Sequence, residues 1–156
     1  MQRILELENR RHFCKRLASV AACASGAALL QACSGNPSNG IPGSSLPTIS
    51  GTLSVAGVTV PIDAGSPLAA TGGMALVTSN GGDFLVTRTG ATTFVALTAQ
   101  CTHQACLVSD ATSTTYVCPC HGSEFDPSTG RVVVGPAVAA LRQFSTAFSG
   151  NVLTIA

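Results

Sequence analysis

C-T-H-Q-A-C at residues 101–106 and C-P-C-H-G-S at residues 118–123 are the two stretches of this sequence that decide its fold. They place four cysteines and two histidines within 21 residues, whereas the other three cysteines of the chain all lie before residue 34. Each stretch combines a cysteine with a histidine, as C-x-H in the first and C-x-x-H in the second. Two thiolates and two neutral imidazoles form one mixed ligand set, and two cysteines are left over.

This mixed ligand set suits an iron–sulfur centre, because neutral imidazole in place of thiolate makes a cluster less negative and raises its potential. The two stretches resemble the Rieske [2Fe–2S] family, in the form found in the iron–sulfur subunits of cytochrome bc and b6f complexes. The resemblance extends over about residues 72–156. It implies a [2Fe–2S] cofactor, with Cys101 and Cys118 bound to one iron and His103 and His121 to the other.

The two remaining cysteines are Cys106 and Cys120. In that branch of the family the corresponding pair forms a disulfide that ties the two cluster loops together, so the resemblance implies the same bond here. A disulfide needs an oxidising compartment. The related ferredoxins of ring-hydroxylating oxygenases lack the pair and work in the cytoplasm.

A structural zinc ion is the non-redox alternative, since two Cys and two His are also a zinc ligand set. Zinc sites more often use a C-x₂₋₄-C pair with an H-x₃₋₅-H pair than two mixed pairs. A zinc-stapled binding module therefore stays open as the structural alternative.

Residues 1–33 read as an export segment. Arg10-Arg11, Phe13 and Lys15 resemble a twin-arginine signal and precede an apolar stretch, the order of a secretory signal. Cys33 ends a lipobox-like sequence and is the predicted lipidation site. One alternative is an uncleaved membrane anchor, although the apolar stretch is shorter than the roughly 20 residues of a spanning helix, and another is a fully released soluble protein. We expect a domain tethered to the membrane on the periplasmic side.

The rest of the chain divides into a linker and a domain. Residues 34–47 are rich in Ser, Gly, Pro and Asn, which predicts a flexible linker. Residues 48–156 have the size of one small domain. After residue 33 the chain has three arginines, five acidic residues and no lysine, so nucleic acid is not an expected partner.

The domain is predicted to be all-β, an antiparallel β-sandwich of the Rieske type with a cluster-binding subdomain formed by two loops. Val, Thr and Phe dominate, and glycine breaks recur. Asn80-Gly81-Gly82-Asp83 predicts a hairpin turn, and Gly150-Asn151 another. The expected strands cover residues 52–62 (one or two strands around Gly57), 74–78, 84–88, 93–99, 114–117, 131–134, 143–148 and 152–155.

Four residues outside the ligand set are predicted to tune the cluster, by resemblance. Ser123 supplies a hydroxyl that donates toward the cluster sulfurs, which raises the potential. Phe125 stands where high-potential relatives have a Tyr, so one donor is missing and a lower potential is expected. Gly135 and Pro136 resemble a proline-containing loop that covers the cluster. Gln104 and Ala105 replace a Leu and a Gly that are common in quinol-oxidising relatives.

The sequence therefore predicts a one-electron carrier between redox proteins, such as a cytochrome or a subunit of a larger oxidoreductase. No paired acids or nucleophile–base arrangement is apparent, so oxidoreductase activity is expected only within a complex. One alternative is the quinol-oxidising iron–sulfur subunit of a cytochrome bc complex. Another is the small subunit of a molybdenum oxidoreductase such as arsenite oxidase.

Overall fold

The computed structural model describes residues 43–156, and these residues contain fourteen strands and no helix. The predicted signal, the lipidation site Cys33 and the linker up to residue 42 lie outside the described residues. In chain order the strands are β1 (Ser44–Ser45), β2 (Thr48–Ser50), β3 (Thr52–Ser54), β4 (Gly57–Pro61), β5 (Met74–Thr78), β6 (Phe84–Arg88), β7 (Phe94–Thr98), β8 (Asp110–Ala111), β9 (Tyr116–Val117), β10 (Glu124–Phe125), β11 (Val132–Val134), β12 (Gln143–Phe144), β13 (Thr146–Ser149) and β14 (Val152–Ile155).

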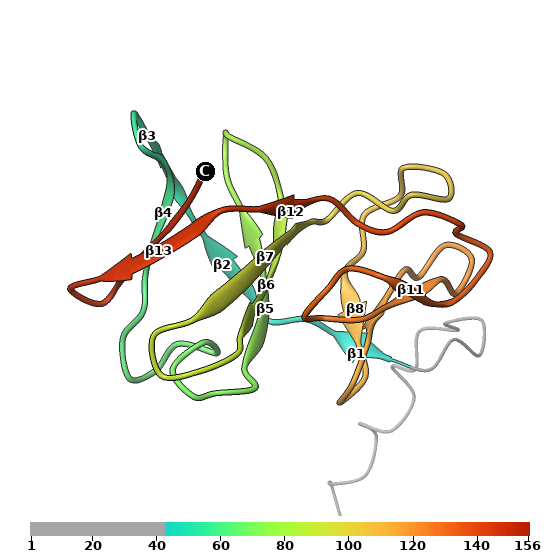
Figure 1. Ribbon diagram of the computed structural model, residues 1–156, viewed down its shortest axis with the longest axis horizontal. Coiled ribbons are helices and arrows are strands. Elements are labelled where there is room, and N and C mark those ends of the chain that lie inside the picture. The colour runs from blue at the N-terminus through green and yellow to red at the C-terminus, as the bar shows by residue number, and fades with distance from the viewer. Residues whose placement is uncertain (1–42) are drawn as a thin grey trace, which may run out of the picture. The chain divides into compact units, whose positions relative to one another are not determined.

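The strands form three sheets. Sheet A has the order β1-β8-β9-β10-β11, sheet B the order β12-β7-β6-β5-β2, and sheet C the order β13-β14-β4-β3. Figure 1 shows β3, β4 and β13 of sheet C on one side of sheet B, and β1, β8 and β11 of sheet A on the other. The all-β prediction is confirmed, with three sheets and with one parallel pair, β2 with β5, among antiparallel ones.

Sheet B is the central layer because both of its faces are buried. Along β5 and β6, Leu76 and Leu85 reach the apolar core shared with sheet A, whereas Val77 and Val86 reach the core shared with sheet C. Successive side chains of a strand point to opposite faces, so a strand buried on both sides needs apolar residues at nearly every position. This explains the continuous apolar sequence of these strands.

A short N-terminal segment, residues 44–50, joins two of the sheets, and we call it the strap. Its first part, β1, pairs with β8 in sheet A, and its second part, β2, pairs with β5 in sheet B. Leu46 between them is only 7% exposed and belongs to the core between these sheets. The β-domain thus includes the last residues of the segment for which a linker is predicted.

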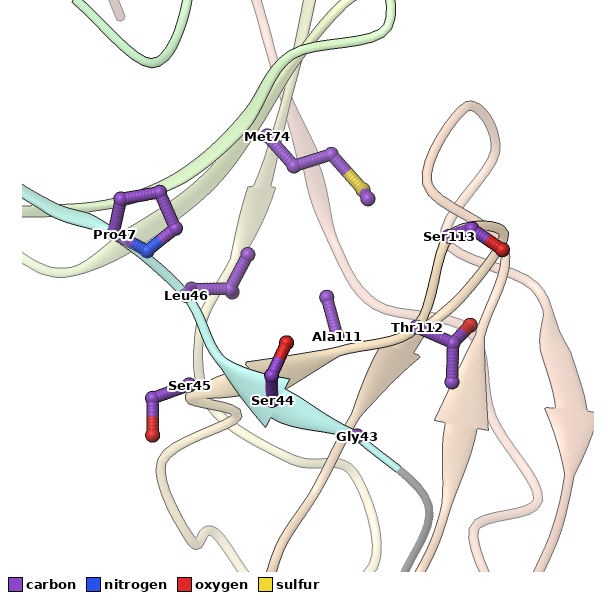
Figure 2. Close-up of a pocket in the computed structure, with 9 residues that line it drawn as sticks. All are labelled: Gly43, Ser44, Ser45, Leu46, Pro47, Met74, Ala111, Thr112 and Ser113. Atoms are coloured by element: carbon purple, nitrogen blue, oxygen red, sulfur yellow. The ribbon is translucent and has the colours of Figure 1, made fainter.

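A groove of about 600 Å³ runs beside the strap. Figure 2 shows Leu46 directed toward Met74, and Ser44 beside Ala111 on the neighbouring strand. The residues that line the groove are small, hydroxyl-bearing or apolar, and none of them titrates.

Most strand predictions agree with the structure. The strands predicted at 74–78, 84–88 and 152–155 are β5, β6 and β14, and residues 52–62 contain the two strands β3 and β4. The turn at Gly150-Asn151 is confirmed, with φ of 55° and 62° at its two residues, as a two-residue type I′ hairpin requires. No helix of the described residues could span a membrane.

Residues 143–148 were expected to form one strand and form two. β12 pairs with β7 in sheet B, whereas β13 pairs with β14 in sheet C. The chain therefore passes from one sheet to the next at Ser145. Such a change of sheet depends on partner strands elsewhere in the chain and leaves no break in the local apolar pattern.

Candidate metal centre

The first candidate ligand loop lies between β7 and β8. The Cys101 N–H donates to the Cys106 carbonyl oxygen (2.8 Å), and the Ala105 N–H donates to the Cys101 carbonyl oxygen (2.9 Å). Ala105 has a φ of 57°, in the left-handed region that side chains other than glycine seldom adopt. The loop is thus closed at the backbone of its first cysteine.

The second candidate ligand loop lies between β9 and β10 and repeats this arrangement. The Cys118 N–H donates to the Ser123 carbonyl oxygen (2.8 Å), and the Gly122 N–H donates to the Cys118 carbonyl oxygen (3.0 Å). Gly122 has a φ of 72°. In both loops the fourth residue after the first cysteine turns the chain back in a left-handed conformation.

The four predicted ligands form a pair of thiols and a pair of imidazoles, and each pair joins the two loops. Cys101 and Cys118 are free thiols, 3% and 1% exposed, within the core between sheets A and B. The rings of His103 and His121 meet edge to face with their centroids 4.9 Å apart. His121 is exposed and His103 is half-buried, so the imidazoles lie on the outer side of the thiols.

Two observations show that these residues fit a metal cluster. The buried Nδ1 of His103 has no hydrogen-bond partner among the described residues, and such orphaned atoms are rare in proteins. Burial raises the pKa of the Cys118 thiol, and the backbone N–H groups of Cys120 and His121 offset this only in part. A thiolate there needs a cation beside it, and a lone pair on Nδ1 needs a hydrogen-bond donor or a metal ion.

The predicted Cys106–Cys120 disulfide is present and joins the two loops, with a Cα–Cα distance of 6.5 Å. The sulfurs of Cys106, Cys118 and Cys120 lie within 4.8 Å of one another. Since two of them are bonded to each other, only Cys118 in this group offers a thiolate. The disulfide therefore lies beside the candidate ligands as a structural bond.

A third loop, residues 135–140, is held against both ligand loops. The Ala137 N–H donates to the Ser123 hydroxyl oxygen (3.0 Å), and the Thr102 hydroxyl donates to the Ala139 carbonyl oxygen (2.6 Å). Gly135 and Pro136 are exposed, whereas Ala137 is buried. The loop thus approaches the centre through Ala137, which the sequence did not single out.

The two predicted tuning positions, Ser123 in the second loop and Phe125 in β10, are both fully buried. Ser123 accepts its hydrogen bond from Ala137, so the hydroxyl hydrogen stays available for donation. Phe125 packs in the same core as Cys101 and Cys118 and has no hydroxyl. Thr102 could have been noticed because it lies inside the first motif, but no local signal marks Ala137.

A family model, the Rieske [2Fe-2S] domain, matches residues 59–145, more than half of the chain. The cytochrome b6-f complex iron-sulfur subunit of Cyanothece sp. is 42% identical over 59 residues, which are 37% of this chain and 32% of that protein. A Rieske protein of Haloferax mediterranei, named as a subunit of a respiratory nitrate reductase, is 42% identical over 64 residues, 40% of this chain and 29% of that protein. The chain thus spans less than a third of these relatives.

A solved structure extends the comparison to the fold. The plasma membrane Rieske protein PetC3 of Synechocystis PCC 6803 superposes with a TM-score of 0.51 and is 31% identical. The match covers 62% of this chain and 98% of that protein.

Proposed function

Because this chain belongs to the Rieske [2Fe-2S] domain family, we propose that it is a one-electron carrier whose cluster is held by Cys101, His103, Cys118 and His121. The cluster, when bound, accepts one electron and passes it on. The observation that carries the proposal is that two loops joined by a disulfide hold two buried free thiols and a buried histidine nitrogen that has no hydrogen-bond partner among the described residues.

The chain's own residues divide the task between them. Cys101 and Cys118 supply the negative charge in the dry interior, where burial keeps water away from the thiolates. The imidazoles supply neutral ligands on the outer side, and the exposed ring of His121 gives a redox partner its closest approach. Electrons are therefore expected to enter and leave on the histidine side.

Metal analysis and EPR test this proposal. The purified protein should contain two irons and two acid-labile sulfides, and its reduced form should give a Rieske-type EPR signal. Cys118→Ser should abolish both, whereas Ser113→Ala, in a loop outside the centre, should change neither. Stoichiometric zinc without iron would overturn the proposal and favour the zinc-stapled module.

We further propose that the carrier is tethered to the membrane on the periplasmic side, by lipid on Cys33 or by an uncleaved anchor. The support is the order of paired arginines, apolar stretch and cysteine before residue 34. Mass spectrometry of the N-terminus of the mature protein distinguishes the two forms. Cys33→Ala should release a lipid-anchored protein from the membrane and leave an uncleaved one in place.

A second candidate function is that of a subunit in a larger complex, either a quinol-oxidising cytochrome complex or a molybdenum oxidoreductase. The similarity to cytochrome b6-f iron-sulfur subunits favours the first, and the similarity to the Haloferax protein, which is named as a subunit of a respiratory nitrate reductase, favours a subunit of a larger oxidoreductase. A potentiometric titration tests whether the protein is a subunit of a quinol-oxidising complex. A hydrogen bond to the cluster stabilises its reduced state, so Phe125→Tyr should raise the midpoint potential. An unmodified protein already at the potential of a ubiquinol-oxidising subunit would contradict the predicted lowering.

A further inference from the structure

The turn between β5 and β6 brings an asparagine and two glycines together on the surface. Asn80, Gly81, Gly82 and Asp83 are all exposed, and the chain passes through a φ of 124° at Gly82. Glycine adopts such a conformation without the strain that a side chain would add. Asn80 is therefore exposed in a turn whose next residue has no Cβ.

An asparagine followed by glycine loses its side-chain amide without an enzyme. The backbone nitrogen of the glycine attacks the amide carbon of the asparagine and closes a cyclic imide, and ammonia leaves with the proton of that nitrogen. Water then opens the ring at either carbonyl, which gives aspartate or isoaspartate. The attack is intramolecular, because the reacting groups belong to neighbouring residues, and a Cβ on the second residue would crowd it.

Ser79 holds the attacking nitrogen in this turn. Its hydroxyl oxygen accepts a hydrogen bond from the Gly81 N–H (3.1 Å), and the same hydroxyl donates to the Gly82 carbonyl oxygen (2.8 Å). The Gly82 N–H also donates to the Ser79 carbonyl oxygen (3.2 Å). The hydrogen bond from Gly81 has to break before its nitrogen attacks, and the other two resist the deformation that ring closure requires.

We propose that Asn80 is a site of spontaneous deamidation and that the Ser79 hydroxyl slows the reaction in the folded protein. The reaction needs water and nothing from the metal centre, so it does not depend on the function proposed above. Its product carries one more negative charge in a turn that already contains Asp83.

The turn between β3 and β4 supplies a matched control, because it has the same serine contacts. Ser54 Oγ accepts from the Ala56 N–H (3.3 Å) and donates to the Gly57 carbonyl oxygen (2.8 Å). Val55 stands at the position that Asn80 has in the other turn and is fully exposed. Val55→Asn therefore places an asparagine in an equivalent turn, where the next residue has a Cβ.

Gly81→Ala would be a poorer control. A Cβ on Gly81 would lie 2.8 Å from Leu53 Cδ1 and 2.9 Å from Val58 Cγ2, so the substitution would disturb packing as well as chemistry.

Incubation of the folded holoprotein at mildly alkaline pH, followed by digestion with a protease that cuts before aspartate, tests the proposal. This protease releases residues 63–82, in which Asn80 is the only asparagine. Aspartate at this position creates a new cut, whereas isoaspartate leaves the peptide whole and heavier by the difference between water and ammonia. The peptide also separates Asn80 from Asn39-Gly40, the other such pair of the chain.

We expect Asn80 to deamidate and Asn151, which precedes the β-branched Val152, to stay intact. The asparagine of Val55→Asn should react at least about tenfold more slowly than Asn80, because a methyl group crowds the attack. Ser79→Ala should speed the reaction at Asn80 about two- to tenfold, as the loss of one hydrogen bond implies.

Two further measurements show that the hydroxyl acts through the folded turn. Ser79→Thr keeps the hydroxyl and should keep the slow rate. In urea, where the turn is unfolded, Ser79→Ala and the unmodified protein should react equally fast. Circular dichroism before incubation shows which variants are folded.

Three results would overturn the proposal: no reaction at Asn80 in the folded protein, equal rates at Asn80 and in Val55→Asn, or no acceleration by Ser79→Ala. An acceleration that persists in urea would also count against it, because the serine would then act through the local sequence and not through the turn.

Discussion

The two ligand loops share one backbone design and differ in what supports them. Each has the same pair of backbone hydrogen bonds around its first cysteine, and each turns back through a residue with positive φ. The first loop follows β7, a five-residue strand in the doubly buried sheet B. The second lies between β9 and β10, of two residues each, in sheet A.

The difference teaches that the second loop depends on cross-links more than on its strands. A two-residue strand offers few ladder hydrogen bonds and little apolar area. Three contacts to other segments compensate: the disulfide to the first loop, the Ser123 contact with the third loop, and a buried hydrogen bond between the hydroxyls of Tyr116, next to this loop, and Thr87 in β6. Each contact can be removed separately.

Removing the disulfide should have the largest effect. The bond closes a loop of about 15 residues, for which chain entropy predicts about 3 kcal/mol of stability. We expect the Cys106→Ala, Cys120→Ala double variant to unfold at a lower urea concentration and to lose its cluster faster. Urea titration followed by cluster absorbance measures both.

Reduction of the unmodified protein is the control for this variant, because it breaks the same bond without changing side-chain volume. Equal unfolding midpoints with and without the bond would show that the loops hold each other in place without it.

The next largest effect is expected from Tyr116→Phe. The Tyr116 and Thr87 hydroxyls are 2.5 Å apart and buried between sheets A and B. Removing one hydroxyl leaves the other unsatisfied, at a cost of about 1–3 kcal/mol. Thr87→Val and the double variant complete a double-mutant cycle. If the losses of unfolding free energy are purely additive, the two hydroxyls do not stabilise the protein through their mutual hydrogen bond.

The same tyrosine predicts a pH dependence. Burial raises the pKa of Tyr116 well above its usual range. The unfolded chain loses this proton near pH 10, while the folded protein keeps it, so stability is fully present below pH about 10 and falls as pH rises further. Thermal unfolding across this range should show a smaller decline for Tyr116→Phe. If the melting temperatures of both proteins fall equally as pH rises, groups other than Tyr116 cause the loss of stability in alkali.

Exchanging the residues at the positive-φ turns compares the two loops directly. Gly122→Ala should destabilise the protein by about 1–2 kcal/mol, because alanine is strained in this conformation. Ala105→Gly should relieve the same strain in the first loop but adds about 0.4–1 kcal/mol of unfolded-chain entropy. We therefore expect a smaller gain than the loss from Gly122→Ala. If both variants shift the melting temperature in the same direction, the two positive-φ turns are not strained in the same way.

The smallest effect is expected at Asp126, in the turn after β10. Its carboxylate accepts hydrogen bonds from the backbone and hydroxyl groups of Ser128 and Thr129, which lower its pKa. This contribution is present above pH about 4 and is lost as pH falls through the lowered pKa. Asp126→Asn should thus melt slightly lower at neutral pH and like the unmodified protein in acid. If the two proteins still differ in melting temperature at low pH, the substitution acts by changing the hydrogen-bond geometry of the turn and not by removing the carboxylate charge.

The sequence was sufficient for the long strands. β5, β6 and β14 were predicted with their observed bounds, because apolar patterns bounded by turn residues are local signals. The two-residue strands β1, β8 and β10 were missed, since two residues show no period and pair only because partner strands lie beside them. The Cys106–Cys120 bond was predicted from the family resemblance and is confirmed.

The contacts that fix the centre could not be predicted in the same way. Thr102 and Ala139 are 37 residues apart, Thr87 and Tyr116 are 29 apart, and Ser123 and Ala137 are 14 apart. Common polar or small side chains at such separations give no pattern. Only Ser123 was predicted to matter, and its contact with the third loop was not foreseen.

The sequence by itself determined the chemistry of the centre, because residue type fixes which donor atoms exist, and two Cys-His motifs define one mixed set of sulfur and nitrogen ligands. The tertiary structure alone decided which atoms are buried and which are exposed. Burial depends on segments that are distant in the chain, so only the fold could bury His103 Nδ1 with no partner among residues 43–156 and seat Leu46 between two sheets.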